Sequence, residues 1–502
     1  MNLKRMLILF SMLLALFLVA CGGGGVAGGS VLGGSEQGDS GQGGSGHGGF
    51  LLGGGNPFGG ETKGYVEPGV PEEELDLVLY VTSDYAQKEE YYDGMSWEQA
   101  YGYEELQTAI EDASKVSGKC YVAVQQGTYT PKSKANTIFG STTEKHFHFS
   151  LRNGVTVIGG YAGTENDGVP VGTEPTILSG DLNSNDDPEE LASKDDNTYH
   201  VFFHPSVISL NETAELRNAE ISGGYASFNG SNNNRGAGMF NVDCSPTLIN
   251  CTFRQNTISI EASEVAYALG GGLYNTGGNP KLENCTFIQN SIYASSSENK
   301  SIARGAGIYN EKGNPDLSNC VFKMNSISVV NSAEVSGGGM YSSGGSFKLT
   351  NCIFDENIIT SVGNASGGGM YSGGGSLEFI DCFFSKNNVF SETGEAFGGG
   401  ICNANSNSTF TDCTFAENSI IAAKAFGGGM YNKGSGEAYL CDVQLIGNCV
   451  FTENSVVGTT AQGGAVYKAV NNYTTISGEA SYGSGVNANT ANDEQNDMYP
   501  SL

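Results

Sequence analysis

Residues 270–275 read GGGLYN, and after eight further residues the chain continues as NCTFIQN over residues 284–290. A Gly-rich run, an apolar residue and, in most copies, an aromatic residue precede this second motif in seven copies between Gly236 and Tyr467. The repeated cysteines are Cys251, Cys285, Cys320, Cys352, Cys382, Cys413 and Cys449. Self-similarity with a period of 30–36 residues predicts a stacked array of structural repeats.

Within each copy the apolar residues alternate with polar ones, as they do in a strand. Cys251 and Phe253 flank the polar Thr252, so both side chains point to one face. Leu248 and Cys251 can both face inward only if the chain turns at Asn250, and Asn tolerates the left-handed backbone of such a corner. Helical repeats are disfavoured because the Gly triplets would break each helix.

The sequence therefore predicts an all-β fold, a parallel β-helix whose equivalent residues stack about 4.8 Å apart along the axis. A right-handed winding is expected from the usual handedness of crossover connections. Copy length varies between the second Asn and the next Gly run, as in residues 257–269 compared with residues 455–462. Loops of unequal length are therefore expected to leave the coil at one corner.

The first 20 residues have the form of an export signal. Lys4 and Arg5 precede an apolar run over residues 6–18, and residues 18–21 read LVAC. This ending is similar to a bacterial lipobox, which implies that Cys21 receives a lipid and attaches the protein to a membrane. A plain secretory signal followed by a chance Cys is the alternative. Residues 21–76 are Gly-rich and are predicted to form a flexible tether.

The folded part is predicted to begin near residue 77. Residues 77–235 are expected to form an N-terminal cap and the first, irregular coils, and apolar residues at helical spacing place one amphipathic helix near residues 104–115. Such a helix would cover the exposed strand edge of the first coil. The regular array covers residues 236–476, and the polar residues 477–502 are expected to form a disordered tail.

The chain is strongly acidic. It has 24 Lys and Arg against 54 Asp and Glu, which gives a formal net charge of −30. A nucleic acid is therefore excluded as the expected partner, because its phosphates would be repelled. An acidic surface also keeps a repeat array soluble and opposes aggregation of its strand edges.

Two stretches resemble known families. Residues 463–466 (GGAV) and 451–454 (FTEN) resemble the repeats of the chlamydial polymorphic membrane proteins, and the resemblance extends over residues 236–467. Residues 94–97 (GMSW), 127–129 (GTY), 159–161 (GGY) and 177–181 (ILSGD) are similar to the opening of secreted proteins with the pectin-lyase-like right-handed parallel β-helix. The first resemblance implies a β-helix displayed at the cell surface, with several members of that family linked to adhesion. Together with the lipobox-like ending at Cys21, it leads to the expectation of a lipoprotein of the outer membrane.

The seven stacked cysteines suggest disulfides, metal or buried thiols. Parallel stacking holds neighbouring Cβ atoms farther apart than a disulfide requires, so small buried thiols are the favoured interpretation. The sequence contains no Cys-x-x-Cys pair, so a zinc site is not expected. His146, His148, His200 and His204 are weaker candidate ligands, because no third ligand accompanies either pair.

A calcium ion is the one cofactor that the sequence suggests. Asp181, Asn183 and Asn185 place oxygen ligands at alternate positions, as calcium-binding loops do. Asp186 and Ala192 stand where an EF-hand has Gly and Glu, so the segment departs from that motif. The alternative is a solvated acidic loop that binds no ion.

Two weak candidates for catalysis interrupt the column of the first Asn. Asp381 and Asp412 replace Asn in adjacent copies, so both carboxylates are expected on neighbouring coils. Paired carboxylates are the groups that a polysaccharide hydrolase or lyase uses. Asp also fits an Asn corner, however, and no column of Lys or Arg accompanies the pair.

The aromatic column is the favoured binding site. Each aromatic residue follows an apolar one, and adjacent strand residues point to opposite faces, so the aromatic side chains are expected outside if the apolar ones are inside. The alternative is that the aromatic side chains fill the interior and the Met side chains face out. The candidates are Tyr274, Tyr309, Tyr341, Tyr371 and Tyr431. An exposed ladder of rings suits a sugar or a partner protein. The sequence thus favours a non-enzymatic surface lipoprotein for adhesion or glycan binding; a polysaccharide lyase or glycoside hydrolase and a purely structural coat are the alternatives.

Overall fold

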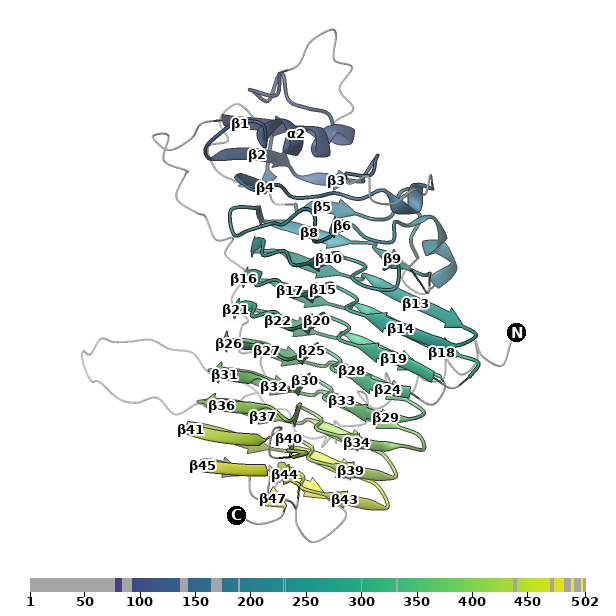
Figure 1. Ribbon diagram of the computed structural model, residues 1–502, viewed down its shortest axis with the longest axis vertical. Helices are drawn as coiled ribbons and strands as arrows, with labels where there is room; N and C mark the ends of the chain where they lie inside the picture. The colour runs from purple at the N-terminus through teal and green to yellow at the C-terminus, as the bar shows by residue number, and fades with distance from the viewer. Residues whose placement is uncertain are drawn as a thin grey trace, which may run out of the picture. The chain divides into compact units, whose positions relative to one another are not determined.

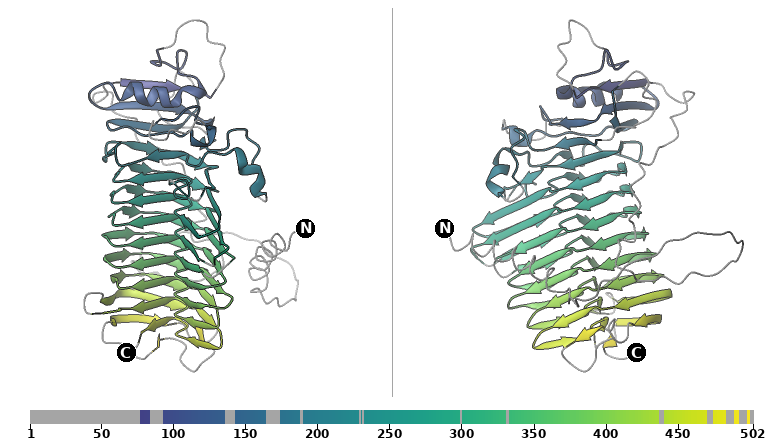
Figure 2. Two further views of the ribbon diagram at one scale, coloured as in Figure 1. Left: turned by 45° about the vertical axis from the view of Figure 1, so that its right-hand side comes forward. Right: turned by 180° about the vertical axis from the view of Figure 1, so that it is seen from behind.

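The computed structural model describes residues 77–499, apart from 84–92, 136–142, 164–173, 188–189, 229, 231, 299, 331–332, 437–439, 470–473, 483–488 and 492–497. The described residues belong to one compact unit, Val66–Leu502. They form a parallel β-solenoid of about ten turns, in which successive coils are stacked along one axis (Figures 1 and 2). The predicted all-β fold with parallel strand pairing is confirmed.

One coil shows the path of the chain in the regular array. The chain runs through β15 (Leu273–Thr276), β16 (Lys281–Glu283), β17 (Thr286–Ile288), β18 (Ser291–Ser296) and β19 (Lys300–Arg304). Each strand pairs in parallel with the equivalent strand of the next coil. Residues in register include Leu273 with Ile308, Phe287 with Phe322, and Ile292 with Ile327. This unshifted register creates the residue columns that the sequence repeats.

The strands that the structure describes lie in four sheets. Strands such as β16 and β17 belong to a 21-stranded sheet, and β15 belongs to a ten-stranded sheet that runs from β6 (Phe202–His204) to β47 (Met498–Tyr499). A nine-stranded sheet contains β18, and a seven-stranded sheet contains β19. The first two sheets enclose the main core, which contains the repeated Leu, Cys and Phe side chains.

Segments predicted as loops at one corner are largely strands. Residues 257–269 form β13 (Thr257–Ala262) and β14 (Val265–Leu269), and residues 455–462 form β42 (Ser455–Val457) and β43 (Thr460–Gln462). We call these strand pairs and their equivalents the second lobe. Their alternate residues enclose a separate core of mostly Ala, Ile and Val, so the loop prediction was wrong beyond the first short strand.

The corners have the predicted backbone. Asn250, Asn284, Asn319 and Asn351 have φ of 53–54°, in the left-handed region where Asn is tolerated. Each Gly run also begins in this region, with φ of 72° at Gly270. The following Gly residues are needed for another reason: a Cβ on Gly271 would lie 2.5 Å from the carbonyl oxygen of Ala306 in the next coil.

Two columns of side chains hold the interior together. The Phe rings of the motif stack face to face, with centroids 4.5 Å apart between Phe322 and Phe354. The second Asn of the motif is fully buried, and in the fourth copy Asn357 Nδ2 donates to the carbonyl oxygen of Phe322 at 2.8 Å and to Asn387 Oδ1 at 2.9 Å. Each such Asn therefore links its own coil to the coils before and after it.

A helix covers the first coil, as predicted. Helix α2 (Leu106–Ala113) buries Leu106, Ala109, Ile110 and Ala113 in the same core as β1 (Leu77–Val81) and β2 (Cys120–Gln125). Within the described residues, β1 forms a ladder with β2 alone, apart from a single bridge between Val81 and Tyr101, so it is the terminal strand of the stack; α2 lies across it (Figure 2). The helix is shorter than the predicted residues 104–115.

The C-terminal residues add a coil where a disordered tail was expected. Strand β45 (Thr474–Tyr482) pairs with β41 (Cys441–Thr452), and β46 (Thr490–Ala491) pairs with β42. The side chain of Asn489 accepts a hydrogen bond from Asn454 Nδ2 at 2.8 Å, which extends the buried Asn ladder. The prediction of disorder for residues 477–502 is therefore wrong for these described residues.

Candidate functional site

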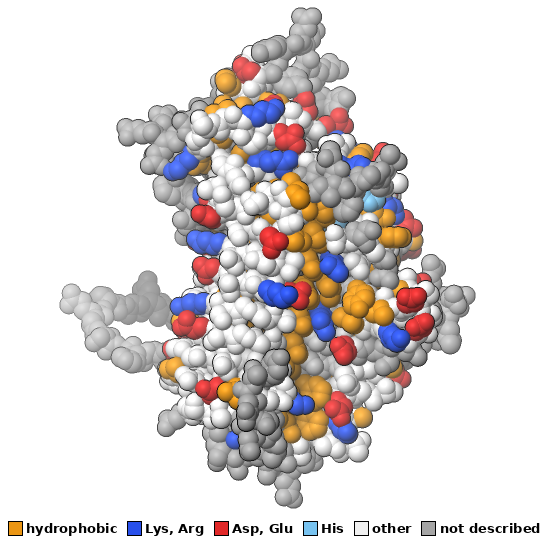
Figure 3. Space-filling model, in the orientation of Figure 1, with side chains coloured by type: hydrophobic (Ala, Val, Ile, Leu, Met, Phe, Trp, Pro, Cys, Tyr) orange, Lys and Arg blue, Asp and Glu red, His pale blue; other side chains and the backbone are white. Residues whose placement is uncertain are grey.

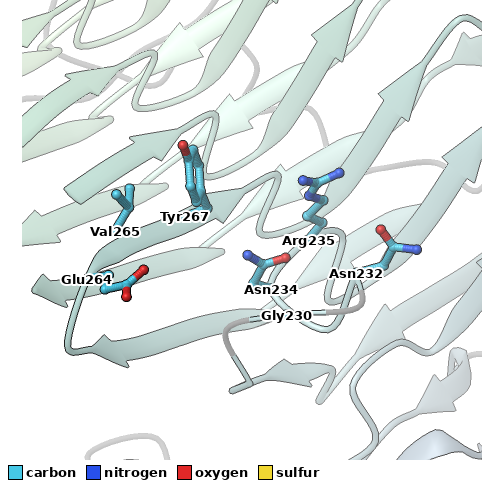
Figure 4. Close-up of a pocket in the computed structure, with 7 residues that line it drawn as sticks. All are labelled: Gly230, Asn232, Asn234, Arg235, Glu264, Val265 and Tyr267. Carbon is cyan, nitrogen blue, oxygen red and sulfur yellow. The ribbon is translucent and has the colours of Figure 1, made fainter. Parts of the chain in front are cut away.

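A pocket opens at the N-terminal end of the second lobe, where its strands are longest. Strand β14 forms the edge of the seven-stranded sheet, and the chain before β10 (Met239–Val242) reaches it through a bridge between Arg235 and Leu269. The space left beside this edge has a volume of about 410 Å³. The lining residues are Gly230, Asn232, Asn234, Arg235, Glu264, Val265 and Tyr267. Figure 4 shows residues 230–235 on one side of the pocket and β14 with Glu264 on the other.

Arg235 is held in place by an aromatic ring. Its guanidinium lies 5.4 Å from the centroid of Tyr274, and Nη1 donates to the hydroxyl of Tyr274 at 3.3 Å. The Nε atom is buried and has no hydrogen-bond partner within the described residues. Tyr274 therefore orients the guanidinium of Arg235 beside the pocket, in a chain that contains only six Arg.

Tyr267 supplies an exposed aromatic surface beside that cation. Its side chain is 40% exposed, whereas the rings of the aromatic column are mostly buried. The pocket also contains the carboxamides of Asn232 and Asn234 and the carboxylate of Glu264. An exposed ring with several directional hydrogen-bond groups around it can stack on a sugar and hold its hydroxyl groups.

The predicted aromatic ladder exists, but it is not an exposed one. Tyr274, Tyr309, Tyr341 and Tyr431 are only 3–6% exposed, and Tyr371 is partly buried. Their rings stack at about 5 Å, for example 5.0 Å between the centroids of Tyr309 and Tyr341. The column faces away from the main core, as expected, but the second lobe packs beside it.

The burial of the ladder leaves only a narrow apolar stripe. Leu269 and Ile302, from the seven-stranded sheet, contact the same cluster as Tyr274 and Tyr309. Figure 3 shows the stripe running along the array beside the second lobe. The expectation that whole Tyr faces are available to a ligand is therefore wrong, and Tyr274 instead orients Arg235.

Asp381 and Asp412 lie at neighbouring corners in the predicted register. Both have left-handed backbones, with φ of 51° and 53°, and both side chains are exposed. Asp412 Oδ1 accepts a hydrogen bond from the backbone N–H of Asn448 at 2.7 Å. No Lys or Arg forms an ion pair with either carboxylate among the described residues. This geometry suits a corner at which Asp substitutes for Asn.

The repeated cysteines are buried free thiols within the described array. Each Sγ donates to a backbone carbonyl one coil earlier, as Cys285 does to Leu248 at 3.4 Å and Cys320 to Leu282 at 3.5 Å. Burial raises the pKa of the Cys320 thiol well above its ordinary value, so it stays protonated. The thiols thus pack as small apolar groups with weak donors.

Three of the four candidate histidines, His148, His200 and His204, are buried at the N-terminal end of the aromatic ladder, and His146 is half-buried. The ring centroids of His148 and His200 lie 5.3 and 5.1 Å from that of Phe203. His204 accepts the Leu151 N–H at Nε2 and donates from Nδ1 to Asn241 Oδ1 at 2.7 Å. Burial lowers the pKa of His148 to about 3 and the pKa of His200 and His204 to about 4. Both nitrogens of His204 are therefore committed to the protein.

The expected calcium ligands do not converge as the sequence suggested. Asp181 accepts the backbone N–H groups of Asn185 and Asp186, at 3.3 and 3.1 Å, and so closes its own loop. The side chain of Asn183 is exposed. Within the described chain, no group of three or more His, Cys, Asp or Glu is arranged to hold a metal ion.

The predicted signal, the lipid site Cys21 and the tether at residues 21–76 lie outside the described residues. The membrane partner and the outer-membrane location therefore stay predictions. In the part of the chain that the structure describes, no helix has the length and apolar character needed to span a bilayer.

Sequence reasoning missed Arg235, Tyr267 and the Asn residues of the pocket. Tyr267 lies in β14 in register with Ile302, so its column is not aromatic in the next coil. Arg235 is in register with Leu269 and then with Arg304, which lies over the ring of Tyr341, but Leu269 interrupts this column. The one available signal was the position of Arg235 directly before the first Gly of the array, in a chain with few Arg.

Comparison with protein-family models gives no match, and comparison with curated proteins gives none either. No family model therefore supports the resemblance of residues 236–467 to the polymorphic membrane protein repeats. Among solved structures, the chain is similar to PfbA, a surface adhesin of Streptococcus pneumoniae, with 11% sequence identity and a TM-score of 0.20. The match covers 68% of this chain and 85% of that chain. So distant a likeness carries no functional argument, and the fold rests on the strand register described above.

Proposed function

We propose that this chain is a lipid-anchored surface protein of the outer membrane whose β-solenoid displays a binding pocket for neutral glycans. The main support for this proposal is the composition of the pocket. It is lined by Arg235, by the carboxamide residues Asn232 and Asn234, and by the exposed ring of Tyr267. Sugars are recognised by this combination of an aromatic surface and directional polar groups.

The scaffold suits this role because it fixes the pocket in advance. Arg235 is oriented by Tyr274, and Tyr274 is clamped in the stacked ladder, with its ring centroid 5.1 Å from that of Tyr309. Preordered side chains lose little conformational entropy when a ligand binds. Tyr309, Tyr341, Tyr371 and Tyr431 act in this proposal as the support of the site and not as its surface.

Charge selects between classes of glycan. The chain has a net charge of −30, so long-range repulsion opposes polyanionic polymers. Inside the pocket the negative charge of Glu264 balances the positive charge of Arg235, and the side chains of Asn232 and Asn234 are uncharged. Neutral oligosaccharides are therefore favoured over acidic ones.

A glycan array probed with the purified full-length chain tests the proposal. Binding of neutral glycans should be lost in Tyr267→Ala and Arg235→Gln, which remove the platform and the cation. Val457→Ala is the matched control, because this residue is 47% exposed at the far end of the same lobe. Equal binding by all three variants would contradict the pocket assignment.

The alternatives predict different results from the same preparation. A polysaccharide lyase or hydrolase would release product, and Asp381→Asn would abolish the release. A purely structural coat would bind no glycan on the array. Asp381 and Asp412, on which the enzyme alternative depends, lie exposed at corners of the solenoid.

A further inference from the structure

A cluster of oxygen atoms lies in the connection between β5 (Thr176–Ser179) and β6, around the short helix η4 (Leu191–Asp196). Residues 181–197 contain seven Asp and Glu but a single Lys. We propose that Asn185, Asp186, Asp196 and Asn197, with the carbonyl oxygen of Ser193, bind one Ca²⁺ ion. This ligand set differs from the Asp181, Asn183 and Asn185 set that the sequence suggests, and it is independent of the glycan pocket.

Three of these oxygens face one another with no hydrogen between them. The carboxamide oxygen of Asn185 lies 3.2 Å from Asp196 Oδ1 and 3.3 Å from the carbonyl oxygen of Ser193. Acceptors gathered in this way repel one another unless a cation or a donor lies between them. Rotation of the Asn185 amide would place its NH₂ group against both oxygens as a donor, so this contact by itself does not require a cation.

Three buried oxygens keep their surroundings when the Asn185 amide rotates, and these oxygens indicate a bound cation. Asp186 Oδ1, Asp196 Oδ2 and Asn197 Oδ1 are buried and have no hydrogen-bond partner within the described residues. Asn197 is 0% exposed, and its Nδ2 donates to Asp186 Oδ2 at 3.0 Å, which places its carboxamide against that carboxylate. Unpaired buried carboxylate oxygens are costly, and a bound cation removes the cost.

The ligand chemistry indicates Ca²⁺. Carboxylate, carboxamide and carbonyl oxygens are hard ligands, and the set contains neither His nor Cys. Lys194 Nζ already pairs with Asp186 Oδ2 at 2.8 Å, which leaves Oδ1 for the ion but reduces the local negative charge. We therefore expect a dissociation constant of about 10⁻⁴–10⁻³ M, the range of extracellular calcium modules, with water completing the coordination.

The ion would fasten this connection to the second lobe. The carbonyl oxygen of Thr198 accepts the N–H of Tyr225, and Asn197 Nδ2 donates to the carbonyl oxygen of Gly223, each at 2.7 Å. Tyr225 begins β9 (Tyr225–Ala226), the edge strand of the nine-stranded sheet, next to which Figure 1 shows the connection. Calcium would thus order the segment that covers an otherwise open strand edge.

Calorimetric titration of the chelator-treated full-length chain with CaCl₂ tests the site. We expect saturable binding of one ion, and Asp196→Asn should raise the dissociation constant at least about tenfold. Asp195→Asn removes the same charge from the adjacent, exposed residue and should leave binding unchanged. Absence of saturable binding, or equal weakening by both substitutions, would overturn the proposal.

A second measurement keeps the test valid if Asp196→Asn fails to fold. Limited proteolysis of the wild-type chain should cut residues 181–198 several-fold more slowly in CaCl₂ than in chelator, because the ion orders this connection. Cleavage at the same rate in both would overturn the proposal. Protection by MgCl₂ equal to that by CaCl₂ would overturn the assignment of the ion.

Discussion

Replacement of Asn357 by Ala probes the buried Asn ladder at its centre. The substitution removes the acceptor of two hydrogen bonds from Asn325, one from its backbone N–H at 3.1 Å and one from Nδ2 at 2.9 Å. It also removes the donor to the carbonyl oxygen of Phe322 at 2.8 Å. The backbone N–H and the Nδ2 group of Asn325 each lose a buried acceptor. Each lost hydrogen bond costs about 1–3 kcal/mol, so we expect the free energy of unfolding to fall by about 2–6 kcal/mol.

The matched control lies six residues earlier in the same coil. Asn351 Nδ2 donates to Asn319 Oδ1 at 2.8 Å, but the side chain is exposed and its φ is 53°. Because Gly adopts this backbone freely and water replaces the bond, Asn351→Gly should cost less than about 1 kcal/mol. Denaturant unfolding followed by circular dichroism gives both values. Equal losses in the two variants would refute the inference that the second Asn column carries the stability.

Three further predictions concern the core and its titratable groups. Phe354→Ala should cost about 3–5 kcal/mol in denaturant unfolding, whereas Phe228→Ala, at a side chain that is 55% exposed, should be near neutral; similar losses would place Phe354 outside the core. Burial lowers the pKa of His204 from 6.5 to about 4, so the unfolded chain binds the proton first, and stability should fall by on the order of 3 kcal/mol as the pH drops from about 6.5 to about 4. His204→Gln should flatten this part of the pH profile, and an unchanged slope would contradict the assignment. Because burial raises the pKa of Cys320, iodoacetamide should modify this thiol only after unfolding, and modification of the native chain, detected by mass spectrometry, would contradict its burial.

The main solenoid could be predicted because its side chains recur in register. Cys251, Phe253 and their equivalents point into one core in the regular coils. Asn250 has the left-handed backbone of the corner between the strands. These three residue types therefore mark the inward faces and the corner of each repeat. A parallel array places each residue against its own equivalent, and the period of the sequence therefore gives the pairing directly.

The second lobe could not be predicted from the same reasoning. Its strands are short and differ in length, from six residues in β13 to three in β42, and its core contains small residues such as Ala266 and Ala268. Alternation of Ala with Ser or Tyr is too weak a pattern to separate a strand from a loop. The same omission explains the error about Tyr309 and Tyr341, because an unseen lobe covers them.

The candidate site was only indirectly accessible from the sequence. The aromatic column is real, but its part in the site is the orientation of Arg235 by Tyr274. The convergence of the pocket residues depends on how the segment that contains Arg235 passes the edge of β14. The buried oxygens around Asp196 and Asn197 likewise depend on tertiary packing and not on spacing.

The most direct test of the account asks whether the chain binds neutral glycans without cleaving them. The full-length chain and the double variant Asp381→Asn, Asp412→Asn should be compared for glycan binding and for release of reducing ends or unsaturated products. The account predicts equal binding by both proteins and no product from either, since the pocket at Arg235 and Tyr267 is intact in each. Product formed by the wild type and abolished in the double variant would contradict it.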